Sequence, residues 1–540
     1  MTNITRRDFI LASTTALAGS AIPPVFASES SKYVRYNVTT PEGQEMLKSY
    51  IKGIKVMLSL PADHPNNWFR NAFIHMMDCP HGNWWFYVWH RAYIGYFEET
   101  IRKFSGNDNF TLPFWDWTET PEIPSTMFDS VLSPTAKEYL PYTENLAVFT
   151  DFIKPELSNY WKTLTPSQRK QQAERGYNTF EDLWNSVVGI NDGQGIAGDM
   201  AYVNTLGARF LSKGNPYLDP KTRFDVSPLV VGAGIVLPTT FYEENNYMSF
   251  ASSKTKSHTV SPNSATKFSI LEGFPHNKVH NCIGGVSHTD PGPYGNMTNF
   301  LSPVDPIFFL HHANMDRLWD VWSRKQKANG LPDLPNGSDL LNYVQQRFEF
   351  FVDSNGKHVG PKEAGDFLST NIFHYKYADG FGEKFVKPYK NHTTRSTIST
   401  VVAKVQNNIA TAAISNDDIK SHLNENSQLI AEIVIPRSNN SSSSREYDVI
   451  VNAPDHITQV DADSPYYAGT IAFFGPKMKH MNMSHDTVFQ VPLHKKLQAF
   501  TQMGQGNTTS FNIRVVPSNT TQHSSVPILK AINIQSVKLP

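Results

Sequence analysis

Cysteine is scarce in this chain, since its 540 residues include only Cys79 and Cys282. Two cysteines cannot build the disulfide framework of a small secreted scaffold. An excess of one charge sign is also missing, because 48 basic and 49 acidic residues leave a formal net charge of −1. That balance gives no electrostatic attraction to nucleic acid or to anionic membranes, so we expect neither as a partner.

Long hydrophobic runs are absent as well, and no stretch is long and apolar enough to span a bilayer. The N-terminus carries Arg6-Arg7 before a weakly apolar stretch, and small residues at cleavage-site positions around Ala27. This pattern predicts a twin-arginine export signal over residues 1–27 and a periplasmic or secreted protein. The alternative is a surface helix with a chance arginine pair.

The length of the chain predicts two domains. Apolar residues recur at helical spacing through the first part, which predicts a mainly α domain over residues 28–385 whose four-helix bundle carries a metal site. The helices are expected over residues 42–60, 66–75, 84–104, 271–282 and 303–325. The fourth of these is expected to open at Pro275, where a missing N–H is harmless. Over residues 121–265 the sequence predicts mainly loops, with helices over 180–188 and 200–211. We expect this stretch to provide a contact between the subunits of a homo-oligomer.

Short alternating strands dominate the rest of the chain and predict a second domain over residues 395–540. Phe511, Ile513 and Val515 alternate in the manner of a half-buried strand. Seven such strands indicate an antiparallel sandwich or barrel. They are expected over residues 396–406, 428–435, 446–453, 468–474, 487–493, 510–516 and 528–539.

Two groups of histidines are the chemical signal of this sequence. His276 and His280 are four residues apart, hence on one face of a helix, and the pair His311/His312 follows. The upstream group is His75, His81 and His90. Imidazole suits copper, zinc, iron and nickel, and a single pair at this spacing is more often ordinary surface or core histidine. Two groups without carboxylate or thiolate favour a pair of redox-active copper ions over a zinc hydrolase.

Three motifs then resemble one family. The stretches CPHGNWWFYVWHR (residues 79–91), HNKVH (276–280) and DPIFFLHHANMDRLW (305–319) are similar to the copper signatures of tyrosinases, catechol oxidases and molluscan-type haemocyanins, the type-3 dicopper proteins. The resemblance is specific over residues 57–116 and 271–324, and looser through Tyr375-x-Tyr377. It implies two copper ions, with these ligands: His75, His81 and His90 for copper A, and His276, His280 and His312 for copper B.

Two ligand positions are open to a second assignment. His312 stands four residues before Asp316, as the family signature requires of its ligand, which leaves His311 beside the site. His75 and His81 are only six residues apart, whereas relatives insert a longer loop, so His64 is the alternative first ligand.

The resemblance also implies supporting residues. Cys79 would form a thioether to His81, the alternatives being a buried thiol or a disulfide to Cys282. Glu272 and Asn277 would hold a water that takes the proton of a phenol. The alternative is that Glu272 only interacts favourably with the helix dipole and that Asn277 is a surface residue. Phe300 would be an aromatic gate over copper A, or plain core. In relatives a C-terminal sandwich covers the site with an apolar stopper, which the sequence does not identify.

The resemblance therefore implies an enzyme that uses O2 to ortho-hydroxylate phenols and to oxidise o-diphenols to o-quinones. Its partners would be phenolic small molecules and O2. The alternatives are a catechol or o-aminophenol oxidase without hydroxylase activity and a haemocyanin-like oxygen carrier. Separately, the stretch Met478–His485 combines thioethers and imidazoles that suit Cu(I), although a solvated loop is the plainer interpretation.

Overall fold

The computed structural model describes most of the chain. The described residues are 31–189, 208–244, 248–289, 294–388, 397–437, 444–475, 486–494, 508–519 and 527–539. The predicted export signal, most of the predicted helix 200–211 and the stretch from Met478 to His485 lie outside them. No helix in the described ranges combines the length and the apolarity that a membrane span requires.

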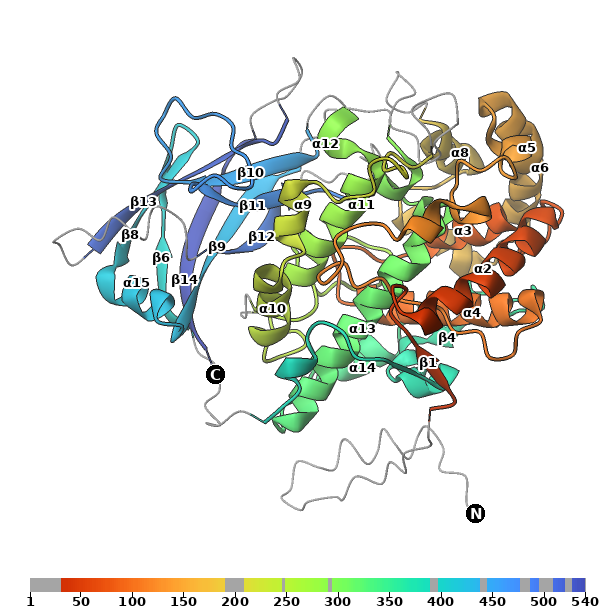
Figure 1. Ribbon diagram of the computed structural model, residues 1–540, viewed down its shortest axis with the longest axis horizontal. Helices are drawn as coiled ribbons and strands as arrows, with labels where there is room; N and C mark the ends of the chain where they lie inside the picture. Colours follow the sequence, from red (N-terminus) through yellow and green to blue (C-terminus); the bar gives the residue numbers. More distant parts are fainter. Residues whose placement is uncertain are drawn as a thin grey trace.

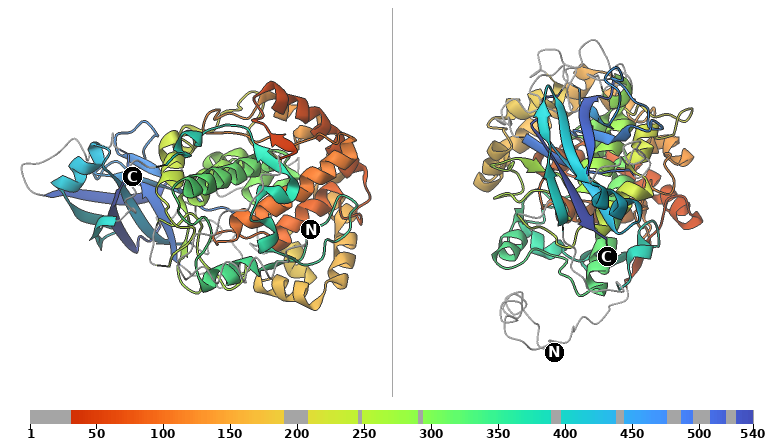
Figure 2. Two further views of the ribbon diagram at one scale, coloured as in Figure 1. Left: turned by 90° about the horizontal axis from the view of Figure 1, so that it is seen from below. Right: turned by 90° about the vertical axis from the view of Figure 1, so that its left-hand side faces the viewer.

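The first part of the chain is helical, and the β region lies at one end of it (Figures 1 and 2). Its longest helices are α2 (Pro41–Ser59), α3 (Trp68–Asp78), α4 (Phe86–Ser105), α6 (Leu146–Thr163) and α13 (Ile307–Ala328). The shorter ones are α5 (Leu140–Thr143), α7 (Pro166–Glu174), α8 (Phe180–Val188), α9 (Pro220–Asp225), α10 (Pro228–Val236), α11 (Asn277–Gly284), α12 (Val286–Thr289) and α14 (Ser338–Val344).

Helix α4 lies at the centre of this part, packed against α2 and α13. It is buried along nearly its whole length and ends at Gly106, whose left-handed conformation suits glycine. Tryptophan and phenylalanine side chains fill the core around it; among them are Trp89 and the stacked pair Phe97 and Phe309. A close-packed aromatic core of this kind holds its inward-facing side chains in fixed positions.

The helix that carries His276 and His280 differs from the prediction, because it does not open at Pro275. The chain is already helical at Ile270, and Pro275 lies inside a π-helical turn, η4 (Glu272–His276), that continues into α11. Proline removes one backbone donor and widens the turn, so a π turn is the local solution that keeps the helix continuous.

The last part of the chain forms two five-stranded sheets. One has the order β11 (Tyr467–Ala472), β10 (Glu446–Val451), β13 (Thr508–Pro517), β8 (Ile409–Ser415), β7 (Lys404–Gln406). The other has the order β2 (Thr266–Lys267), β12 (Asp486–Pro492), β9 (Ser427–Pro436), β14 (Ala531–Lys538), β6 (Thr397–Val402). Apolar residues of both sheets share one core, as the predicted sandwich requires.

Three elements of the β region were not predicted, namely β8, α15 (Asn416–Leu423) and β2. Strand β8 has the sequence IATAAIS, whose small side chains give little strand signal, and helix α15 follows it directly. The short strand β2 belongs to the helical part in sequence, yet it pairs in parallel with β12. The two parts of the chain are therefore joined by backbone hydrogen bonds as well as by side chains.

Candidate metal centre

The two histidine groups meet in the core of the helical part. His75 lies on α3, His81 in the loop that follows, and His90 on α4. In the second group, His276 ends the π turn, His280 lies on α11, and the pair His311/His312 lies on α13. The groups touch, since the rings of His90 and His312 are stacked with centroids 4.2 Å apart and those of His81 and His276 are 5.6 Å apart.

The ring orientation of four histidines is fixed through Nδ1. His75, His90 and His280 direct Nδ1 at the carbonyl oxygens of Phe300, Phe86 and Met297, at 2.6, 2.7 and 2.6 Å. His276 directs Nδ1 at Oδ1 of Asn277, at 3.0 Å. Because these oxygens only accept, Nδ1 carries the proton and Nε2 keeps its lone pair for a metal.

The Nε2 atoms are placed as the ligands of a cation would be. Nε2 of His75 and Nε2 of His90 are 3.4 Å apart, and Nε2 of His280 and Nε2 of His312 are 3.3 Å apart. Two nitrogen ligands at about 2.0–2.1 Å from one tetrahedral metal stand about 3.3 Å apart, so both separations fit. The buried Nε2 atoms of His81 and His276 have no hydrogen-bond partner among the described residues.

Burial keeps these imidazoles neutral. It lowers the pKa of His75 and of His276 to about 3, and lowers that of His81, His90, His280 and His312 well below the ordinary value. Repulsion between neighbouring imidazoles adds to the effect at most of these positions. Neutral imidazole is the form that binds a metal, so the residues present fit two all-imidazole copper sites.

His311 is distinguished from His312 by its tautomer. One nitrogen of each lies in the same cluster as His276 and His280, within 4.8 Å of one another. However, Nδ1 of His311 accepts a hydrogen bond from the indole N–H of Trp117 at 3.2 Å. A neutral imidazole that accepts at Nδ1 carries its proton on Nε2, which therefore has no lone pair for copper. This geometry supports His312 as the third ligand of the second group.

The positions of His64 and of the two cysteines bear on the alternative first ligand and on the predicted thioether. Nδ1 of His64 accepts from the backbone N–H of Asn66, and His64 is outside both metal-capable clusters, whereas His75 is inside one. Neither cysteine forms a disulfide. Sγ of Cys79 lies 3.3 Å from Nδ1 of His81, close enough to the ring for the predicted thioether. Cys282 instead accepts from the backbone N–H of Asp219.

Glu272 is a buried carboxyl group between the two histidine groups. Its oxygens accept hydrogen bonds from the N–H of Gly82, at 2.6 Å, and from the hydroxyl of Ser252. Gly82 has φ +66°, and a Cβ there would lie 2.8 Å from Thr266, so glycine is required at this contact. Burial raises the pKa of Glu272 to about 8. A carboxyl group poised near neutral pH is suited to proton transfer.

Asn277 is buried, so the alternative of a surface asparagine is wrong. Besides fixing His276, its Nδ2 donates to the carbonyl oxygen of Ala472 at 2.9 Å. Nδ2 of Asn281 likewise donates to the carbonyl oxygen of Phe473 at 3.3 Å. The neighbours of two predicted ligands thus bind the segment of the β region that follows β11.

That segment carries Phe474 into the site. The centroid of its ring is 4.4 Å from His280, 4.8 Å from His81 and 5.5 Å from His276. Gly475 follows with φ +79°, and a Cβ there would lie 2.9 Å from the ring of Phe300, so only glycine permits this approach. The sequence contains an aromatic pair followed by Gly-Pro at the end of a predicted strand, which marks this segment as unusual. It does not show which part of the protein the aromatic side chains contact.

Phe300 has two contacts with the first histidine group. Its carbonyl oxygen holds His75, and its ring centroid is 5.7 Å from that of His81 and 5.7 Å from that of Phe474. Phe300 is only partly buried and lines a small pocket at the surface. The role of Phe300 as a gate stays a prediction of the sequence.

The ligand helix α13 is anchored by ion pairs. Asp316 accepts from Arg91 at 2.7 Å and from the hydroxyls of Tyr375 and Tyr377, and Arg317 pairs with Asp116 at 2.9 Å. These contacts tie the Tyr375-x-Tyr377 motif to the helix that carries His312. These contacts lie in the core rather than in a cleft, so we infer that they hold the ligand helix in place and take no part in the chemistry.

Comparison with known proteins gives the same assignment. Residues 64–325 match the family described as the common central domain of tyrosinase. A chloroplastic polyphenol oxidase from Spinacia oleracea is 23% identical over 353 residues, which are 63% of this chain and 46% of that protein. A tyrosinase from Hahella sp. (strain CCB-MM4) is 27% identical over 311 residues, 56% of this chain and 48% of that protein. The chain spans about half the length of these relatives.

The fold is similar over a longer range. A structure of recombinant latent aurone synthase (polyphenol oxidase) superposes with a TM-score of 0.55 at 17% identity, covering 97% of this chain and 93% of the other. Helical copper domain and C-terminal β region thus occur together in both folds. Residues 64–325, which carry both histidine groups, form a tyrosinase central domain, and this part of the chain belongs to the tyrosinase family of dicopper proteins.

Proposed function

We propose that this protein is a dicopper oxidase that uses O2 to ortho-hydroxylate phenols and to oxidise the resulting o-diphenols to o-quinones. The observation that carries the proposal is the contact between the two histidine groups, with His90 stacked on His312. Ions held by His75, His81 and His90 and by His276, His280 and His312 would be close enough to share one small ligand. Bound copper would supply the reduction of O2 and the oxidation of the phenol.

The chain itself would supply a base and a dry site. A phenol has a pKa of about 10, so it needs a proton acceptor before it can bind as phenolate at neutral pH. Glu272 lies between the loop of His81 and the turn of His276, and its raised pKa makes it that acceptor, through a water held with Asn277. Nearby copper cations would lower the pKa of Glu272 from its metal-free value toward the working pH.

We also propose that Phe474 is the stopper. Its ring covers His280 and His81, and the hydrogen bonds from Asn277 and Asn281 hold its segment in place. A phenol and the ring of Phe474 would compete for the same apolar space. The full chain would therefore be of low activity until the β region moves. Export by the twin-arginine route remains a prediction of the sequence.

Oxygen uptake by the full-length two-copper protein carrying Phe474→Gly tests the activity. The matched substrates are para-cresol and the corresponding methylcatechol. Uptake with both supports the proposal. Uptake with the catechol alone identifies a catechol oxidase, and reversible O2 binding without consumption of either identifies an oxygen carrier.

A further inference from the structure

The pocket that leads to the histidines is positively charged. We define this entrance pocket, of about 100 Å³, by six lining residues: Cys79, His81, Arg175, Phe300, Arg437 and Phe474. Two of the six are arginines, and no aspartate or glutamate is among the described residues that line it. A phenol on its way to the histidines would therefore pass two guanidinium groups, of which that of Arg175 is buried and that of Arg437 partly buried.

Arg175 follows helix α7 and is only 5% exposed. Its guanidinium donates to the carbonyl oxygens of Cys79, at 2.7 Å, and Met76, at 2.9 Å, and lies 5.8 Å from the ring of Phe300. Within the described part of the chain, its Nε has no hydrogen-bond partner and no carboxylate forms an ion pair with it. A buried cation that is offset only by carbonyl dipoles is stabilised by an added anion.

Arg437 comes from the other side of the pocket, directly after strand β9. It is partly buried, donates to the carbonyl oxygen of Gly475 at 2.5 Å, and lies 5.3 Å from the ring of Phe473. Its buried Nε is also without a partner among the described residues. Burial, with repulsion from Arg445, lowers the pKa of Arg437 to about 9, so an anion beside it would restore its ordinary basicity.

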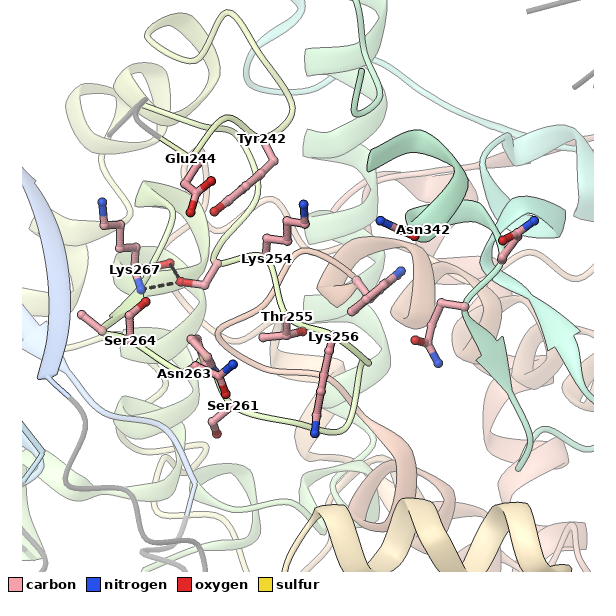
Figure 3. A pocket seen from close by; sticks show the side chains of 16 residues that line it. Tyr242, Glu244, Lys254, Thr255, Lys256, Ser261, Asn263, Ser264, Lys267 and Asn342 are labelled. Carbon is pink, nitrogen blue, oxygen red and sulfur yellow. Dashed lines mark hydrogen bonds between the residues drawn. The ribbon is translucent and has the colours of Figure 1, made fainter. Parts of the chain in front are cut away.

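A second, larger cleft extends the positive charge outward. This lysine cleft, of about 950 Å³, shares Ser261 and Pro262 with the entrance pocket. The side chains of Lys254, Lys256 and Lys267 stand around it (Figure 3), whereas Glu244 is the single acidic residue among its described lining. Lys254 is paired with Asp339, and Lys256 is exposed. In a chain whose net charge is −1, this concentration of positive charge is local to the approach to the site.

We propose that the enzyme selects phenols whose side chain bears a carboxylate, a selectivity that rests on the proposed function. The aromatic ring would enter beside Phe300, into the space that the ring of Phe474 fills at rest, and the carboxylate would remain between Arg175 and Arg437. Guanidinium matches carboxylate in geometry and binds it with two parallel hydrogen bonds, of which each unpartnered Nε can provide one. The lysine cleft would attract the anion from solution.

The test compares one charged and one uncharged substrate. Dihydrocaffeate, a catechol with a propanoate side chain, and its primary amide are assayed with the full-length two-copper protein carrying Phe474→Gly. The expected ratio of kcat/KM, acid over amide, is about tenfold or more at low salt, as a charge-assisted hydrogen bond provides, and arises mainly in KM. It should fall as salt screens the approach.

Arg437→Gln should then lower this ratio by about tenfold. Arg169→Gln is the matched control, because Arg169 is exposed on α7, also donates to backbone carbonyls, and does not line the entrance pocket. If Arg437→Gln does not fold, the salt dependence of the ratio in the parent protein decides. A ratio near one that salt does not change, with both substrates consumed, overturns the selectivity alone. If neither substrate is consumed, the proposed function fails and this inference with it.

Discussion

The imidazole of His312 lies parallel to that of His90, with an interplanar angle of 8° and a centroid separation of 4.2 Å. One residue belongs to the first histidine group and the other to the second, and 222 positions of sequence separate them (312 − 90). Helix α4 packs directly on α13, which brings the two rings together. The halves of the metal centre are thus positioned by one helix–helix contact.

Copper content distinguishes the adjacent histidines on α13. Because Nε2 of His312 faces that of His280, His312→Gln should lower copper from two ions per chain to about one. His311→Gln should retain both, since Nδ1 of His311 already accepts from Trp117. Metal analysis of the purified proteins measures this. Loss of copper from the His311 variant, with full loading of the His312 variant, would exchange the two assignments.

Removing the ring of Phe474 should activate the full chain. Burying a phenylalanine side chain is worth about 1.5–3 kcal/mol, so Phe474→Gly should raise kcat/KM for a catechol by about 10- to 100-fold. Val402→Ala is the control, because Val402 is in the β region and 73% exposed. Steady-state oxygen uptake provides the measurement, and equal values for all three proteins would refute the stopper.

Glu272→Gln should separate the two reactions. Without the carboxylate, hydroxylation of a monophenol should fall by about 10²- to 10³-fold, as for loss of a general base, whereas the more acidic catechol should be affected less. In the parent protein the monophenol rate should rise with pH through the pKa that Glu272 has beside bound copper, which lies below its metal-free value of about 8, because the ionised form is the base. Glu45→Gln, on the exposed face of α2, is the control. An unchanged pH profile in Glu272→Gln would exclude this role.

Acid should destabilise the metal-free protein. The pKa of His75 and of His276 is depressed to about 3 in the folded state, so the unfolded chain binds protons first as pH falls below about 6.5. The stability that these two residues contribute is present above that pH and is lost between pH 6.5 and 3. At pH 5 the loss is about 2 kcal/mol for each. Calorimetry at a series of pH values measures it, and a Tm constant from pH 7 to pH 4 would contradict it.

The contact between Cys79 and His81 predicts a covalent bond in the copper-loaded protein. Bond formation between Sγ and a ring carbon removes one hydrogen from each residue, and O2 reduced at the copper pair takes up the two electrons. Intact mass and peptide mapping should show the loss of two hydrogens in the segment that contains both residues. Cys79→Ser should abolish that loss, whereas Cys282→Ser should not. A free thiol at Cys79 after aerobic copper loading would rule the bond out.

The meeting of the two histidine groups could be predicted from sequence because the spacing of the histidines follows helix geometry and a specific signature. His276 ends the π turn and His280 lies one turn further on in α11, and His90 lies in the second turn of α4. The π turn at Pro275 was not predictable, because a proline within a helical pattern usually marks the start of a helix, whereas here the helix accommodates Pro275 in a wider turn. Phe474 was missed for another reason: its contact with His280 bridges nearly two hundred residues, and strand-end aromatics have no fixed destination.

Strand β2 has a mechanical consequence. Thr266 and Lys267 pair with Thr487 and Val488 of β12, and the same loop, residues 253–267, provides walls to both surface cavities. Any rotation that withdraws the β region must either break this ladder or pull the loop with it. Withdrawal of Phe474 from the histidines and displacement of the loop 253–267 would then be one coupled movement of the β region.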